Sequence, residues 1–188
     1  MRGHLRMTER RSSALNVGWS FPTFPAAAKT EGRVMDLLKL VALDNDDVEV
    51  LSAHLQDAVV KAADIRWRPA EKRLVVALNR FDWEGANGGS SDFRRRLAAL
   101  RFDRVTACKC RNCAATMKDQ VLNLLAVSFE PTVAPAGVVT LTFSGGAALR
   151  LEVECLEAEL ADLGPTWTTD CRPIHAIDGE AIEVAKQG

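Results

Sequence analysis

The residues GVVTLTFSGGAALRLEVECLEAELADLG, from Gly137 to Gly164, decide the expected fold. Apolar side chains recur at every second position along residues 139–143 and again along residues 149–153, which is the period of a β-strand. Between these runs, Ser144-Gly145-Gly146 supplies the positive φ angles that a tight turn needs. We therefore predict a β-hairpin.

Beyond the hairpin, the apolar period changes from that of a strand to that of a helix. Leu156, Leu160 and Leu163 recur at helical spacing. Gly164 stands where the C-terminal cap of a helix would lie, and Pro165 prevents the helix from continuing. This pattern predicts a C-terminal helix that caps the sheet.

Another helix is predicted to begin at the acidic cluster Asp44-Asn45-Asp46-Asp47, because these residues suit the positive end of a helix. Asp44 is the expected N-cap, with Leu43 and Val48 packed across it as a hydrophobic staple. The buried stripe of this helix is expected at Val48, Leu51, Leu55 and Ala58.

Strand patterns elsewhere in the chain complete the expected sheet. They cover residues 37–43, 65–68, 74–81, 97–108 and 121–129, and Gly85 to Ser91 is expected to be a flexible loop. Short connections without βαβ alternation favour a mainly antiparallel sheet. We predict an α+β fold, a strongly bent sheet or small pleckstrin-homology-like barrel of about seven strands with a C-terminal capping helix. An open two-layer α+β sandwich is the alternative.

Composition limits the class of protein. The chain has 188 residues, of which 47% are hydrophobic, enough to bury a core. Residues 1–34 carry six basic and two acidic residues, which leaves 18 basic and 23 acidic residues and a net charge of −5 in the remainder. An acidic body argues against a nucleic-acid partner or anionic lipid. The odd number of cysteines, five, favours a reducing cytoplasm, and no apolar run approaches the roughly 20 residues of a membrane span.

Three segments are expected along the chain. Residues 1–34 lack a sustained period and are expected to be disordered, or to precede a true translation start at Met35. Residues 35–175 form the single predicted globular domain, and residues 176–188 a polar tail.

Five segments of the chain form a recognisable set: MDLLKL (35–40), AHLQDA (53–58), LNRFDW (78–83), LRFDR (100–104) and residues 149–164. They resemble a family of small alphaproteobacterial proteins, the domain-of-unknown-function family number 2948. The resemblance spans roughly residues 35–175, which supports a domain start at Met35. It implies no activity, and the family pattern does not include Cys108, Cys110 and Cys113.

These three cysteines lack a fourth metal ligand nearby. Strand geometry puts Cys108 and Cys110 on one face, and a turn could bring in Cys113, but only the distant Cys171 or His175 could complete a zinc site. We therefore expect free thiols, with no metal and no cofactor. Lys109 and Arg111 could lower a neighbouring thiol pKa, which makes Cys110 and Cys113 the candidate reactive thiols.

No nucleophile with its base can be assembled from the sequence. His54 is expected at the helix surface or at the edge of the core, beside the Leu51 and Leu55 stripe. Neither a Gly-x-Ser-x-Gly nor a His-Glu-x-x-His motif occurs. We name no catalytic residue, and the sequence does not support an enzyme.

An Arg-rich face is the candidate interaction patch, for an acidic partner or RNA. Its residues are Arg66, Arg68, Arg94, Arg95 and Arg96. We expect a non-catalytic binding or scaffolding module with a protein or peptide partner, taken by strand addition beside the last helix as in pleckstrin-like folds. An enzyme with a site in its loops and an RNA-binding protein are the alternatives.

A repeated tripeptide suggests one strand register. Arg80-Phe81-Asp82 and Arg101-Phe102-Asp103 would pair if Phe81 faced Phe102 across two antiparallel strands. Each arginine would then face an aspartate on the outer surface of the sheet.

Overall fold

The computed structural model describes residues 37–87, 93–112, 119–169 and 173, all within one compact unit. The strands are β1 (Lys39–Ala42), β2 (Ala58–Lys61), β3 (Ile65–Arg68), β4 (Arg73–Phe81), β5 (Arg94–Phe102), β6 (Val105–Arg111), β7 (Val121–Pro131), β8 (Gly137–Phe143), β9 (Ala148–Val153) and β10 (Ala158–Thr168). The helices are α1 (Asn45–Leu55) and α2 (Trp83–Asn87), with short 3₁₀ turns η1 (Ala62–Asp64), η2 (Pro69–Glu71) and η3 (Ser144–Gly146).

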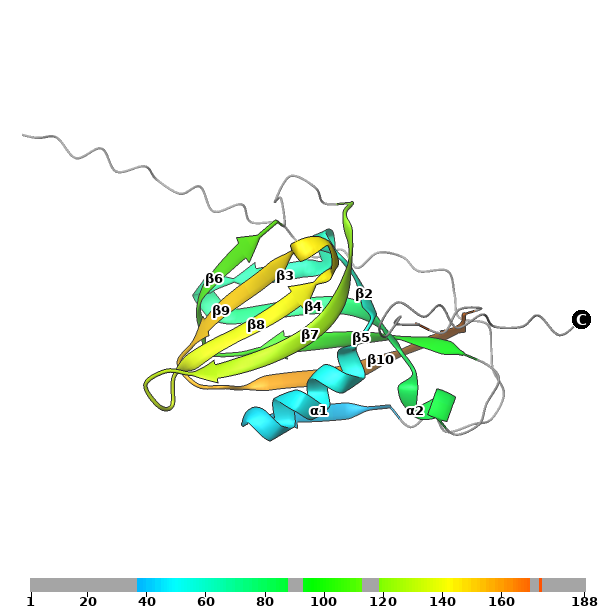
Figure 1. The fold of residues 1–188 in the computed structure, drawn as a ribbon, viewed down its shortest axis with the longest axis horizontal. Helices are drawn as coiled ribbons and strands as arrows, with labels where there is room; N and C mark the ends of the chain where they lie inside the picture. Colours follow the sequence, from blue (N-terminus) through cyan, green and yellow to red (C-terminus); the bar gives the residue numbers. More distant parts are fainter. Residues whose placement is uncertain (1–36, 88–92, 113–118, 170–172, 174–188) are drawn as a thin grey trace, which may run out of the picture. The chain divides into compact units, whose positions relative to one another are not determined.

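All described strands belong to one antiparallel sheet, in the order β1-β10-β5-β4-β2-β7-β8-β9-β6, with β3 paired to β4. The sheet folds over, so that β7, β8 and β9 lie in front of β4 and β5, and α1 lies beside β7 and β1 (Figure 1). The enclosed side chains form one apolar core. The sheet is open, with β1 and β6 at its two ends. Among the described helices, none is long and apolar enough to cross a membrane.

The predicted hairpin is confirmed. Strands β8 and β9 pair antiparallel with Leu141 opposite Leu149, both buried. Gly145 and Gly146 have φ angles of 70° and 72°, as the turn between the strands requires.

The predicted C-terminal helix is wrong, because residues 158–168 form strand β10 between β1 and β5. Ala158, Leu160 and Asp162 point inward at every second position, and all three are buried. Because Asp162 occupies an inward position, the sequence lacks a continuous apolar residue at every second position, which would have predicted a strand. Gly164, expected as a helix cap, instead has a φ of 99° within an irregularity that separates Asp162 from Thr166 in the register with β5.

The predicted first helix is confirmed at its start. Asp44 caps α1, since its side chain accepts a hydrogen bond of 2.9 Å from the Asp47 backbone, while the Asp47 carboxylate accepts one from the Leu43 backbone. Val48, Leu51 and Leu55 are buried as expected. Ala58 is also buried, but in β2, because the helix ends at Leu55.

Other elements differ in detail from the sequence pattern. The single strand expected at residues 97–108 is divided into β5 and β6 near Arg104, whose φ is 60°. Gly85, expected to begin a flexible loop, lies in α2. The expected loop positions 88–91 lie outside the described residues. The ten described strands exceed the expected seven, and the sheet is an open antiparallel one in an α+β fold.

The register expected from the repeated tripeptide is also wrong. Strands β4 and β5 do pair antiparallel, but Phe102 faces Leu74 and Phe81 faces Arg95. This register aligns two buried rows, because Leu74, Val76 and Leu78 face Phe102, Leu100 and Ala98. Continuous burial along both strands outweighs a single aromatic pair.

We predict that Asp44→Ala destabilises the fold by about 1 kcal/mol, because the first turn of α1 loses its cap. Urea unfolding followed by circular dichroism measures this loss. Glu49→Ala, an exposed change on the same helix, is the control and should cost less than about 0.5 kcal/mol. Equal losses in the two variants would contradict the capping role.

Candidate functional site

The feature that organises one end of the sheet is a buried arginine. Arg80 follows Leu74, Val76 and Leu78 on the inward face of β4, where an apolar residue would continue the pattern. Its side chain is 1% exposed. A charge at this depth requires partners that satisfy its donors.

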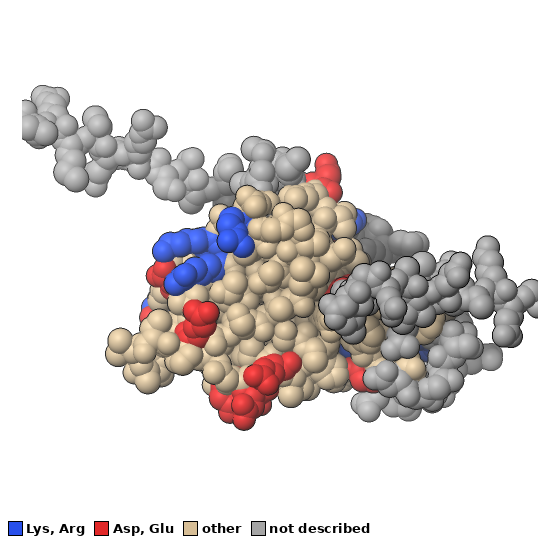
Figure 2. Space-filling view, in the orientation of Figure 1, with Lys and Arg blue, Asp and Glu red and all other residues tan. Residues whose placement is uncertain are grey.

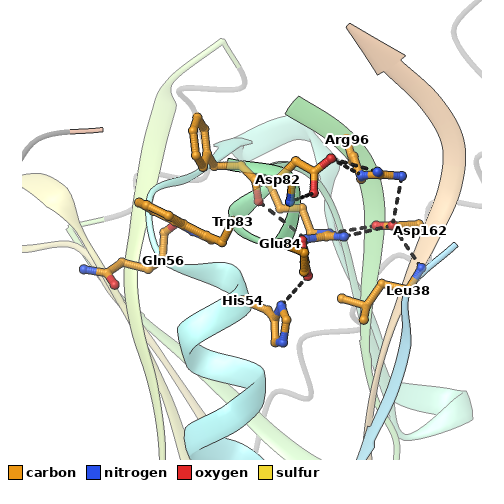
Figure 3. A network of polar contacts seen from close by, with 11 residues as sticks. Leu38, His54, Gln56, Asp82, Trp83, Glu84, Arg96 and Asp162 are labelled. Carbon is orange, nitrogen blue, oxygen red and sulfur yellow. Dashed lines mark hydrogen bonds and ion pairs between the residues drawn. The ribbon is translucent and has the colours of Figure 1, made fainter. Parts of the chain in front are cut away.

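Asp162 of β10 supplies two of these contacts. Arg80 Nε donates to Asp162 Oδ1 at 2.8 Å, and Arg80 Nη2 donates to Asp162 Oδ2 at 2.9 Å. The same carboxylate accepts a hydrogen bond of 3.1 Å from the backbone of Leu38, and the Asp162 backbone donates to the Leu38 carbonyl at 2.9 Å (Figure 3). The bidentate pair therefore ties β4 and β10 to the chain that enters β1.

Two carboxylates at α2 extend the network. Glu84 accepts hydrogen bonds of 3.2 and 3.1 Å from Arg80 Nη1, and its Oε1 lies 2.6 Å from Nδ1 of His54 on α1. Asp82 accepts from Arg96 Nε at 2.8 Å and from the Gly85 backbone at 3.2 Å. Figure 3 shows the labelled side chains of this group pointing toward one another: His54 comes from α1, Glu84 from α2, Asp82 from the residue before α2, and Arg96 from β5. His54 is partly buried, which fits the second of its two predicted positions, the edge of the core.

Electrostatic interactions favour the charged forms of Arg80 and Asp82. Burial disfavours the charged form of Arg80, but the hydrogen bond to Asp162 and the charge of Glu84 outweigh it and raise the Arg80 pKa. Burial alone would raise the pKa of Asp82. Hydrogen bonds to its carboxylate, of which the bond from Arg96 has the largest effect, outweigh burial and lower this pKa. These groups remain charged at neutral pH, so the arrangement suits a structural clamp.

The contacts of Asp162 with Arg80 and with the Leu38 backbone hold an exposed edge of the sheet in place. Strand β1 pairs with β10 on one side, and no described strand pairs with its other side. Leu37, Val41 and Leu43 are 47%, 51% and 62% exposed. Together with Lys39 they occupy the outward positions of the segment 37–43. We call this whole segment the β1 edge.

The backbone of the β1 edge has a defined alternation. Because the Asp162 N–H bonds the Leu38 carbonyl, and residues 39–42 continue the register with β10, the ladder bonds fall at Leu38, Leu40 and Ala42. The N–H and C=O groups of Lys39 and Val41 then point away from β10. These groups can accept another strand.

The five arginines of the predicted Arg-rich face lie in different environments. Arg66 is exposed on β3, while Arg68 bonds the Glu71 carboxylate. Arg96 belongs to the network, and Arg95 donates to the carbonyls of Asp57 and Asn79. Arg94 is partly buried at the start of β5. The structure therefore does not bring the five arginines together on one surface.

The sequence predicts that Cys110 is a free thiol and a candidate for reactivity. This prediction is wrong, because Cys110 is disulfide-bonded. Cys108 is a free thiol whose pKa is raised by burial. Cys113, Cys171 and His175 lie outside the described residues. Within the described ranges, no three His, Cys, Asp or Glu side chains are grouped closely enough to hold a metal ion.

Sequence reasoning missed the network residues, although a signal was present. Arg80 continues the two-residue series of Leu74, Val76 and Leu78, and Asp162 continues that of Ala158 and Leu160. Two opposite charges that each interrupt an inward apolar series are candidates for a buried pair.

The comparisons place the chain in a family. The profile of the family described as "Protein of unknown function (DUF2948)" matches residues 38–175, and the chain belongs to this family. No curated protein and no solved structure matches the chain. The matched range includes β1 and the network.

We predict that Asp162→Ala destabilises the protein by about 3–5 kcal/mol, because it leaves the Arg80 charge buried without its main partner. Glu157→Ala is the matched control, since it breaks the exposed pair with Arg104 and should cost less than about 1 kcal/mol. Urea denaturation measures both losses. Similar losses in the two variants would show that the buried pair has no special role.

The lowered pKa of Asp82 predicts an acid-dependent loss of stability. The charged carboxylate stabilises the fold above its ordinary pKa of 3.8, and this contribution disappears as the pH falls through the lowered pKa. The difference in unfolding free energy between the wild type and Asp82→Asn should stay constant from about pH 5 to 7 and shrink below about pH 4. Urea titrations at each pH test this, and a difference that grows in acid would contradict it.

Proposed function

We propose that this protein is a non-catalytic binding module that takes an extended peptide segment of a partner protein along the β1 edge. The observation that carries the proposal is the outward backbone of Lys39 and Val41, which is held in extended form beside exposed apolar side chains. Strand addition was the mode expected from the sequence. Its place differs, because the helix that would have bordered the groove is strand β10.

The side chains of the β1 edge define the chemistry of the peptide. Leu37 and Val41 flank Lys39 on one face, and the Lys39 side chain is 65% exposed with one ion-pair contact of 3.6 Å to Glu159. An added strand would place apolar residues opposite Leu37 and Val41 and an acidic residue opposite Lys39. We therefore expect an apolar-x-acidic-x-apolar motif.

The network favours this function by preparing the edge before a partner arrives. Leu38 is fixed by two hydrogen bonds to Asp162, so the strand conformation next to Lys39 does not have to be ordered on binding. A preformed edge lowers the entropic cost of strand addition.

The variant Val41→Pro tests the proposal. It removes an N–H that points away from β10, so the ladder is kept and the fold should survive, whereas strand addition should be lost. Leu40→Pro removes a ladder hydrogen bond and should destabilise the fold. Val133→Ala, an exposed valine between β7 and β8, is the control for loss of surface area.

Peptides selected from a random library on the full chain should be enriched in the expected motif and should bind Val133→Ala like the wild type. They should bind Val41→Pro at least about tenfold more weakly. Bound peptide should slow amide hydrogen exchange at Lys39 and Val41. Selected peptides that bind Val41→Pro equally, or self-association that this variant abolishes, would overturn the proposal.

A further inference from the structure

A second surface lies at the other end of the strand order, on β6, β8 and β9. Here the outer face of the sheet contains a hollow of about 290 Å³. Its lining residues are Lys109, Cys110, Arg111, Thr140, Ala148 and Arg150. Figure 2 shows blue lysine and arginine side chains gathered over the region where Figure 1 places β6 and β9.

Strand register brings the cations together. Lys109 faces Arg150 across β6 and β9, and Arg150 faces Thr140 across β9 and β8. Arg111 lies two residues beyond Lys109 on the same strand and therefore on the same face. Like charges directly opposite each other on neighbouring strands destabilise a sheet. The arrangement works against stability, which is typical of a binding site.

The Glu152 carboxylate lies beside Lys109, one of the cations that line the hollow. Glu152 Oε1 is 2.6 Å from Lys109 Nζ, and the hydrogen bond from Lys109 lowers the Glu152 pKa, with a smaller contribution from the Arg150 charge. Lys109, Arg111 and Arg150 line the hollow, and the Glu152 carboxylate lies beside Lys109. Clustered lysine and arginine side chains attract a small anion even on a body whose overall charge is negative.

We infer that this hollow binds a small soluble phosphorylated compound. Lysine and arginine are the side chains that best bind phosphate oxygens, and the Thr140 hydroxyl adds a donor at the same place. None of the lining residues is aromatic, so the hollow offers no stacking surface for the bases of a single-stranded nucleic acid. Its volume of about 290 Å³ suits a compact ligand. This inference is independent of the proposed peptide binding, because it uses different strands.

Inorganic pyrophosphate is the probe. Isothermal titration calorimetry in phosphate-free buffer at fixed ionic strength should show one site, and the backbone amides of Lys109, Thr140 and Arg150 should shift in nuclear magnetic resonance spectra. Arg150→Gln should weaken binding by about tenfold or more. Glu152→Gln should strengthen binding, since it removes the competing carboxylate.

The control is Lys61→Gln, which removes the same charge from an exposed position of β2 and should change the affinity by less than about twofold. Arg150→Gln should keep or raise the melting temperature at low salt, because it removes a repulsive pair, so its loss of binding cannot come from unfolding. Equal weakening by Arg150→Gln and Lys61→Gln would overturn the inference. So would binding to single-stranded RNA or to anionic vesicles without binding to pyrophosphate.

Discussion

The buried pair of Arg80 and Asp162 is the constraint on which one end of this fold depends. Each side chain is 1% exposed, and its burial is tolerated because the two charges satisfy each other in a bidentate contact. Arg80 also reaches Glu84 of α2, and Asp162 reaches the backbone of Leu38. The pair thereby joins the middle of the sheet, a short helix and the strand at the sheet end. Its geometry determines where the β1 edge lies.

Features set by nearby residues could be predicted from the sequence. The hairpin of β8 and β9 and the cap at Asp44 depend on a few consecutive side chains, so the pattern alone specified them. Strand β10 could not be recognised, because Asp162 replaces an apolar residue in the inward series and the leucines also fit a helical period. The antiparallel α+β class was predicted correctly even though one element was assigned to the wrong type.

The candidate surfaces depend on contacts between distant segments, and this is why sequence reasoning missed them. Lys109 and Arg150 lie on strands that meet only through the register of β6 with β9. The five arginines singled out from the sequence are close along the chain or alternate within a strand, but burial and pairing separate their side chains. Charge clustering in sequence is therefore a poor guide to charge clustering on a sheet.

The pairing of β1 with β10 also affects how the chain folds during synthesis. Leu38 and Asp162 are 124 positions apart, so the strand that begins the sheet has no ladder partner until nearly all of the described chain has left the ribosome. Contacts of such long range are entropically costly to close and slow the folding of β-rich proteins. Before β10 is synthesised, β1 has no ladder partner, and Arg80 lacks the bidentate contact with Asp162. Such an intermediate favours binding by chaperones.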